Sequence, residues 1–165
     1  MKNVSTLIFR TLLVASFALW FGGFTFYVSF VVPIGTEVLG STRTQGFVTQ
    51  QVTHWLNAVN GIAIVLMLIE SAVGWKSSHR WWRIVQLALV VTIAGLLIGL
   101  VVLHTIMDEM IILDEEMITD EVKFYGLHRI YLWASTVQWV AAWGWIPISI
   151  ASWRNADGLP RNKKT

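Results

Sequence analysis

Residues 84–107, IVQLALVVTIAGLLIGLVVLHTIM, contain no Asp, Glu, Lys or Arg. An α-helix rises 1.5 Å per residue, so about 20 residues cross the roughly 30 Å of hydrocarbon in a bilayer. Three further apolar stretches have a similar length, and they are residues 12–33, 53–75 and 125–149. The sequence therefore predicts an all-α protein in which four transmembrane helices form an up-down bundle.

The composition also indicates a membrane protein. Hydrophobic residues make up 55% of the 165 residues and charged residues 13%, whereas soluble domains carry about 25% charged residues. The length is that of one domain, so we expect a single integral membrane domain over residues 1–165. The first apolar stretch is too long for a signal peptide, and no small-residue cleavage site follows it, so we expect this helix to remain in the mature protein. Cysteine is absent, which excludes disulfides, iron–sulfur clusters and thiolate zinc sites.

The basic residues predict the orientation of the bundle. One set of helix ends and connections carries Lys2, Arg10, Lys76, Arg80, Arg83, Arg154, Arg161, Lys163 and Lys164. The opposite side carries Arg43, Lys123 and Arg129, together with an acidic loop over residues 108–123. By the positive-inside rule, both termini are cytoplasmic and the acidic loop is external, in a cell (inner) membrane. Basic residues at helix ends indicate the lipid bilayer and a membrane or periplasmic protein as partners, and not nucleic acid.

Three histidines are predicted to lie near the outer interface. His54 begins the second predicted helix, His104 ends the third and His128 begins the fourth. If the helices follow sequence order around a square, the second and fourth are diagonal, and His54 and His128 face each other across the axis. Two neutral imidazoles placed in this way can ligate the iron of a haem b axially. His104 is then an alternative ligand or a hydrogen-bonding neighbour.

A copper or zinc site is the second hypothesis for the same residues. Imidazole suits both metals, and Asp108 follows His104 by one helical turn, so His54, His104, His128 and Asp108 form the candidate ligand set. A third hypothesis treats the histidines as interfacial side chains of a cofactor-free structural or accessory subunit. The residue pattern leaves these three alternatives open.

Glu70 is an acidic residue well inside a predicted span, where ionisable groups are functional candidates. It lies about 24 Å from His54 along a helix, so the two cannot belong to one site. We expect Glu70 to pair with Lys76, Arg80 or Arg83 on the cytoplasmic side, in preference to relaying protons. A metal-ion permease would need a polar path between His54 and Glu70, and the residues between them are mainly Ala, Val, Ile and Leu.

Two segments resemble a known family of multipass membrane proteins. Residues 19–23, LWFGG, continue through VVP at 31–33 to EVLG at 37–40, and residues 124–129 read FYGLHR. This pattern resembles the TMEM205-like (DUF4149) family over roughly residues 12–150. The family's recurrent Trp-x-Gly-Gly and Leu-His-Arg segments correspond here to Trp20, Gly22, Gly23, His128 and Arg129.

The resemblance implies a multipass membrane protein of poorly defined activity, with a loose similarity to copper-resistance membrane proteins of the CopD type. This chain lacks the Met-rich or His-rich loop of such proteins, which argues against direct copper transport. It also lacks a Ser-His-Asp set, a phosphate-binding glycine loop or paired catalytic carboxylates. We therefore expect a non-enzymatic membrane protein with a haem or metal site near the outer face, with an accessory subunit as the alternative and copper or metal-ion handling third.

Overall fold

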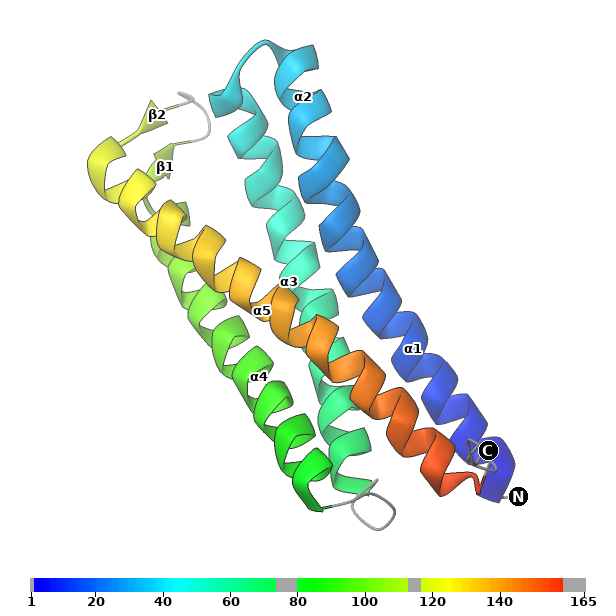
Figure 1. Ribbon diagram of the computed structural model, residues 1–165. Helices are drawn as coiled ribbons and strands as arrows, with labels where there is room; N and C mark the ends of the chain where they lie inside the picture. The colour runs from blue at the N-terminus through cyan, green and yellow to red at the C-terminus, as the bar shows by residue number, and fades with distance from the viewer. Residues whose placement is uncertain (1, 74–79, 113–116, 159–165) are drawn as a thin grey trace, which may run out of the picture.

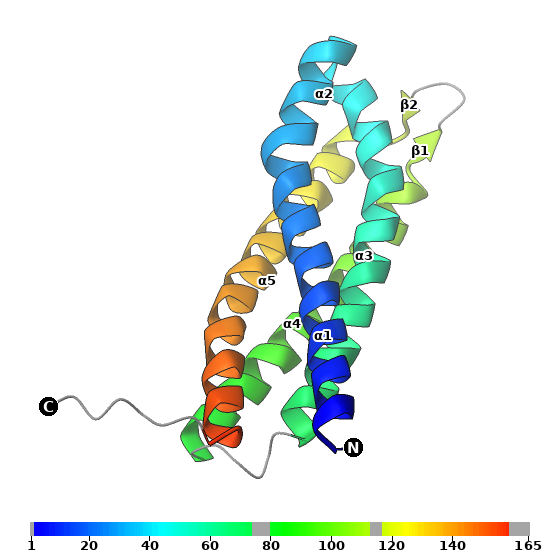
Figure 2. The same cartoon turned by 90° about the vertical axis from the view of Figure 1, so that its right-hand side faces the viewer.

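The structure is a computed structural model, and it describes residues 2–73, 80–112 and 117–158. Predictions that rest on Lys76, Arg161, Lys163 and Lys164, or on the acidic residues 114–116, lie outside these ranges. Every long element of the described part is a helix, as the sequence predicted. Figures 1 and 2 show these helices side by side, with consecutive long helices running in opposite directions.

The first helical rod has three parts. α1 spans Lys2–Phe26, the π-helix η1 spans Tyr27–Val31, and α2 spans Val32–Leu39. The N–H of Val32 donates to the carbonyl oxygen of Tyr27, five residues earlier, which is the π pattern. Pro33 follows directly and has no N–H with which to continue the four-residue pattern. Gly40, at φ 67°, ends the rod in the left-handed conformation that favours glycine.

Three further long helices follow, and they are α3 (Thr42–Val73), α4 (Arg80–Asp108) and α5 (Glu121–Ala156). Each predicted transmembrane span lies inside a helical segment and is shorter than that segment. The end of the second predicted span, at residue 75, lies outside the described residues. Apolar composition marks only the part of a helix that matches the hydrocarbon thickness. The backbone hydrogen bonds continue into polar flanks such as residues 42–52.

The connection between α4 and α5 contains a short antiparallel hairpin that the sequence did not predict. β1 (Ile111–Ile112) pairs with β2 (Met117–Ile118), in the register Ile111 with Ile118 and Ile112 with Met117. Strands of two residues are too short to produce a recognisable alternation. The side chain of Asp120 then accepts a hydrogen bond from the N–H of Lys123 and caps α5.

The long helices surround a common axis in sequence order. α1 packs on α3, α3 on α4, and α4 on α5. Aromatic side chains join α5 to α1: Phe17 stacks on Trp145 at 5.7 Å between ring centroids, and Phe21 stacks on Trp139 at 5.6 Å. The start of α1 and the end of α5 lie at one end of the molecule, where Arg10 and Asp157 form an ion pair of 2.7 Å.

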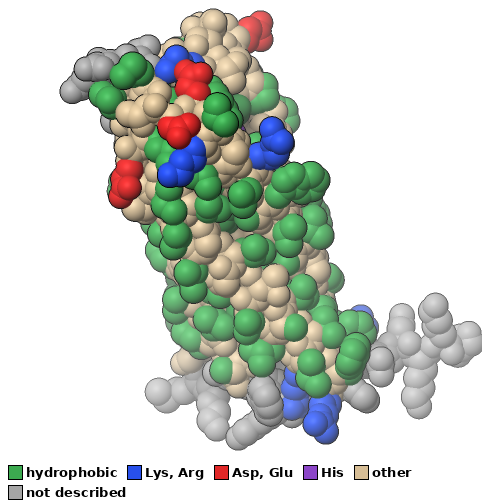
Figure 3. All heavy atoms as spheres, turned by 90° about the vertical axis from the view of Figure 1, so that its left-hand side faces the viewer, with side chains coloured by type: hydrophobic (Ala, Val, Ile, Leu, Met, Phe, Trp, Pro, Cys, Tyr) green, Lys and Arg blue, Asp and Glu red, His purple; other side chains and the backbone are tan. Residues whose placement is uncertain are grey.

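The outer surface is apolar over the middle of the rods. Large hydrophobic side chains face outward there, among them Leu19 and Ile98, while charged side chains gather toward the two ends (Figure 3). Three helices are long and apolar enough to cross a membrane: Val4–Leu39, Thr42–Ala72 and Arg80–Asp108. These are the features of a membrane protein. α5 does not meet the same criterion of length and composition within the described residues.

The interior has two unlike halves. One half lies toward the terminal end, where α1 begins and α5 ends. Its tightly packed apolar core contains the fully buried Leu13, Met67, Ile93 and Trp145. At the middle of the bundle the packing becomes polar, where the amides of Asn60 on α3 and Gln138 on α5 form a hydrogen bond of 3.1 Å. Beyond that level, toward the hairpin, polar side chains such as Gln45, Gln50 and His104 lie among apolar and aromatic side chains around a cavity.

Candidate metal centre

His104 occupies the last turn of α4 and is almost completely buried, with 5% of its surface exposed. Its Nδ1 lies 2.9 Å from Oδ2 of Asp108. The two residues are four apart, so their side chains lie on one face of the helix. The other carboxylate oxygen of Asp108, Oδ1, accepts a hydrogen bond of 2.9 Å from Nε2 of Gln50 on α3. Asp108 is therefore held by two elements.

The second nitrogen of His104 is free to act as a ligand. Nε2 is buried and has no hydrogen-bond partner among the described residues. In a neutral imidazole with the proton on Nδ1, Nε2 carries the lone pair. Metal-binding histidines usually donate their other N–H to a carboxylate, which fixes the tautomer and orients the ring. The pair His104–Asp108 has this arrangement.

His54, on α3, completes the cluster. Its ring centroid lies 5.0 Å from that of His104. His54, His104 and Asp108 each offer a ligand atom, and these atoms all lie within 4.8 Å of one another. Ligands bound to zinc or copper at 2.0–2.2 Å in a tetrahedron are about 3.4 Å apart, so the groups must close by roughly 1 Å around an ion. The exposed side chain of His54 has the room to turn.

His128 lies apart from this cluster. Its ring stacks on Phe124, with a centroid distance of 6.2 Å. His128 lines the same internal cavity as His104, whereas His54 is not among the residues that line it. The structure thus brings together His54, His104 and Asp108 of the four predicted ligands, and it places His128 on another wall.

The cavity has a volume of about 590 Å³ and lies in the half of the bundle that carries the hairpin. α1, η1, α2, α3, α4 and α5 all contribute to its walls. Tyr131 of α5 lines the cavity, and its ring centroid is 6.4 Å from that of His104. A space of this size is within the usual range for small-molecule sites.

The cavity does not continue to Glu70 as a polar path through the described residues. Ala63, Ile64 and Met67 follow Asn60 on α3, and they pack against Val90, Ile93, Ala141, Ala142 and Trp145. This buried layer is apolar. A desolvated ion has no ligands within it.

Glu70 lies beyond this layer and is 7% exposed. The indole N–H of Trp153, near the end of α5, donates to Oε1 of Glu70. The guanidinium of Arg10 lies over the ring of Trp153, 5.2 Å from its centroid. The expected pairing with Arg80 or Arg83 is absent from the ion pairs of the described residues. Because α5 continues to Ala156, an indole reaches the carboxylate instead.

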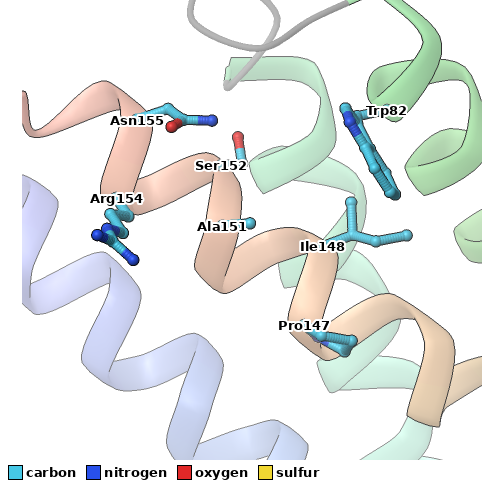
Figure 4. Close-up of a pocket in the computed structure, with 7 residues that line it drawn as sticks. All are labelled: Trp82, Pro147, Ile148, Ala151, Ser152, Arg154 and Asn155. Carbon is cyan, nitrogen blue, oxygen red and sulfur yellow. The ribbon is translucent and has the colours of Figure 1, made fainter. Parts of the chain in front are cut away.

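A second hollow, of about 460 Å³, lies at the terminal end between α4 and α5. Trp82 faces Pro147 and Ile148 across it, while Arg154 is directed away from Trp82 (Figure 4). Among the described residues, no His, Asp or Glu lines this hollow. The metal-ligating groups therefore lie at the opposite end of the bundle.

The residues that correspond to the family's recurrent segments do not share one environment in the structure. Trp20 is buried and lines the cavity, whereas Arg129 is exposed. A side-chain carbon at Gly22 would meet nothing within 4 Å, and one at Gly23 would make an ordinary contact with Leu56. No family model, curated protein or solved structure matches this chain. The resemblance to the TMEM205-like family remains a prediction.

The sequence analysis missed two residues of the centre, Gln50 and Tyr131. Gln50 lies four residues before His54, and Tyr131 lies three residues after His128. Both spacings place a pair on one helix face. A search for polar side chains one turn from each histidine would have found them.

Proposed function

We propose that this chain is a non-enzymatic integral membrane protein that binds a transition-metal ion, copper or zinc, through His54 and His104. The observation that carries the proposal is the buried Nε2 of His104, which has no hydrogen-bond partner among the described residues. The His104 ring lies 5.0 Å from that of His54 between centroids, and its Nδ1 lies 2.9 Å from Asp108. Imidazole nitrogen is a preferred ligand of both metals. Asp108 either orients His104 or joins the coordination sphere.

The proposed topology has four membrane crossings, with both termini cytoplasmic and the metal site on the outer side. The ion pair of Arg10 with Asp157 supports termini on one side. α5 is as long as its neighbours and packs along α4, which supports a fourth crossing. A reporter fused after Thr165 should read cytoplasmic, and one inserted beside Glu116 should read external. The opposite result in both fusions would overturn the orientation.

The apolar layer between Asn60 and Glu70 favours holding a metal over conducting it across the membrane. In the proposed topology, a site at the outer end exchanges its ion with the external compartment or with a periplasmic protein. The exposed His54 is the residue through which an ion reaches the buried His104.

The test is metal titration of detergent-purified protein that has first been treated with a chelator. Calorimetry with Zn²⁺, and separately with Cu²⁺, should give one ion per chain. His54→Ala and His104→Gln should each lose binding, while His128→Ala should retain it. Circular dichroism of each variant verifies that the helix content is unchanged. Unaltered binding in both His54→Ala and His104→Gln would overturn the assignment.

A haem is the second candidate, because His104 and His128 line one cavity of about 590 Å³. Haem binding predicts a Soret band that shifts on reduction by dithionite. The variant pattern then differs from that of the metal site, since His128→Ala should lose the band and His54→Ala should keep it. Absence of both metal and haem would favour the cofactor-free accessory subunit.

A further inference from the structure

The cavity has an outer level and a deep level. Gln50, His104 and Asp108 form the outer level, next to the proposed metal centre. Asn60 lies six residues after the proposed ligand His54 on α3, which is about 9 Å along the helix at 1.5 Å per residue. The deep level around Asn60 is therefore a separate place, too far from the metal ligands to share them.

The polarity of the deep level is set by a chain of amides. Nε2 of Gln138 donates to the backbone carbonyl of Ile93 at 2.9 Å, and a carbonyl can only accept. The oxygen Oε1 of Gln138 then accepts from Nδ2 of Asn60 at 3.1 Å. This orientation leaves Oδ1 of Asn60 as a hydrogen-bond acceptor.

Oδ1 of Asn60 is buried and has no hydrogen-bond partner among the described residues, and the whole residue is 1% exposed. A buried acceptor without a partner destabilises the folded state. Asn60 is among the residues that line the cavity, so a turn of its amide would present Oδ1 to a donor there. The deep level is therefore complementary to a group that carries an O–H or N–H donor.

Aromatic side chains line the same cavity as Asn60. Trp20 and Trp139 both line the cavity. Trp139 is fixed in place, because its indole N–H donates to Oγ1 of Thr25 at 2.9 Å and its ring stacks on Phe21. Rigid aromatic walls favour a flat ring as the occupant.

The cavity can be reached from the side of the bundle. Tyr27, Val28 and Thr36 line it from the first rod, and His128 and Leu132 line it from α5. The ribbons of α2 and α5 diverge toward the hairpin end (Figure 1). Val28 and Leu132 are exposed on the outer surface and also line the cavity, so a molecule dissolved in the bilayer can enter beside them.

We propose that the deep level binds a lipid-soluble quinol, which is a flat ring with two hydroxyl groups and an apolar tail. One ring hydroxyl donates to Oδ1 of Asn60, the ring lies near Trp20 and Trp139, and the tail leaves between the first rod and α5. The oxidised quinone has carbonyl oxygens in place of the hydroxyls and cannot donate to Asn60. The site therefore distinguishes the reduced ligand from the oxidised one, and this inference does not depend on a bound metal.

The test uses the full chain in phosphatidylcholine nanodiscs with a metal chelator present. Decylubiquinol and decylubiquinone are titrated separately, the first under reducing conditions. Calorimetry measures the affinity, and tryptophan fluorescence reports occupancy near Trp20 and Trp139. We expect saturable binding of the quinol at one per chain and about tenfold weaker binding of the quinone, the effect of one hydrogen bond.

Asn60→Leu should bring the quinol affinity down to that of the quinone. The matched control is Gln86→Leu, which removes an equally buried amide that is bonded to Ser149 at the other end of the bundle. This control should keep the preference for quinol. If Asn60→Leu does not fold, the comparison of quinol with quinone in the unaltered protein still decides.

Three results would overturn the proposal. They are equal affinity for quinol and quinone, no saturable binding of either, or binding of decanol in competition with the quinol and with the same affinity. The last result would assign the site to any hydroxylated apolar chain. Metal binding is measured in a parallel titration without ligand. Loss of quinol binding with intact metal binding, or the reverse, separates a failure of this inference from a failure of the proposed function.

Discussion

Nδ1 of His104 lies 2.9 Å from Oδ2 of Asp108, one helical turn further along α4. This contact fixes the histidine ring and leaves its Nε2 without a protein partner among the described residues. The carboxylate is itself held, because Gln50 of α3 donates to its second oxygen. Two helices therefore determine the orientation of one buried imidazole.

Asp108→Asn tests the role of this carboxylate. The amide keeps the shape of the side chain but removes the negative charge that supports His104. We expect metal affinity to fall by about 10–100-fold, the usual effect of changing the partner of a metal-binding histidine. Titration with Zn²⁺ measures it. Glu121→Gln, which removes an exposed carboxylate at the same end of the bundle, is the control and should leave the affinity unchanged.

Gly35→Ala tests the contact between α2 and α3. A side-chain carbon at Gly35 would lie 2.0 Å from Oε1 of the buried Gln45. Gln45 must then move and lose its hydrogen bond with Thr49. We expect a loss of about 1–2 kcal/mol in stability, measured by denaturant titration in mixed micelles.

Gly46→Ala is the matched control for that substitution. Gly46 lies within α3, and an added carbon there meets nothing within 4 Å. Alanine is the better helix former by about 0.5–1 kcal/mol, so this variant should be as stable as the unaltered protein or more so. If Gly35→Ala were as stable as Gly46→Ala, the close approach of α2 to α3 would be wrong.

Trp153→Phe removes the donor of the buried carboxylate of Glu70. Phenylalanine keeps an aromatic face for Arg10, so the main loss is one hydrogen bond. We expect destabilisation of about 1–3 kcal/mol, because Glu70 is left buried without its partner. The same thermal or denaturant assay measures it.

A double-mutant cycle gives the control for Glu70. Glu70→Leu removes the carboxylate, so the further change of Trp153 to Phe should then have little effect. Additive effects of the two substitutions would show that the indole and the carboxylate do not interact.

Met67→Ala tests the apolar layer that separates the cavity from Glu70. Met67 is fully buried, whereas its neighbour Leu68 is 38% exposed on the outer surface. Truncating Met67 should cost about 2–5 kcal/mol by leaving a void, and Leu68→Ala should cost much less. Equal losses would mean that the interior at this level is not closely packed.

The helices were predictable because their signals are local. An apolar run such as residues 84–107 has no other stable conformation in lipid than a helix, since every backbone polar group needs a partner there. The helix ends were less predictable. α2 continues past Pro33, and α3 begins at Thr42, because solvated polar residues at the interface extend a helix without an apolar signal.

The site was predictable in residue type and only in part by arrangement. His104 and Asp108 are one turn apart in the sequence, so their contact follows from helix geometry alone. The proximity of His54 to His104 depends on how α3 and α4 are rotated against each other. Such rotations are decided by packing contacts that no single helix encodes.

The sequence by itself determined that this protein is helical and carries helices apolar enough for a membrane, and it predicted imidazole and carboxylate as the groups of a metal site. Hydropathy, length and the absence of cysteine are properties of the chain alone. Only the tertiary structure decided that His54 lies beside His104, that His128 lies on another wall, and that Asn60, a lining residue of the cavity, has an oxygen with no hydrogen-bond partner among the described residues. These relationships require side chains from different helices, and their distances arise only when the helices pack.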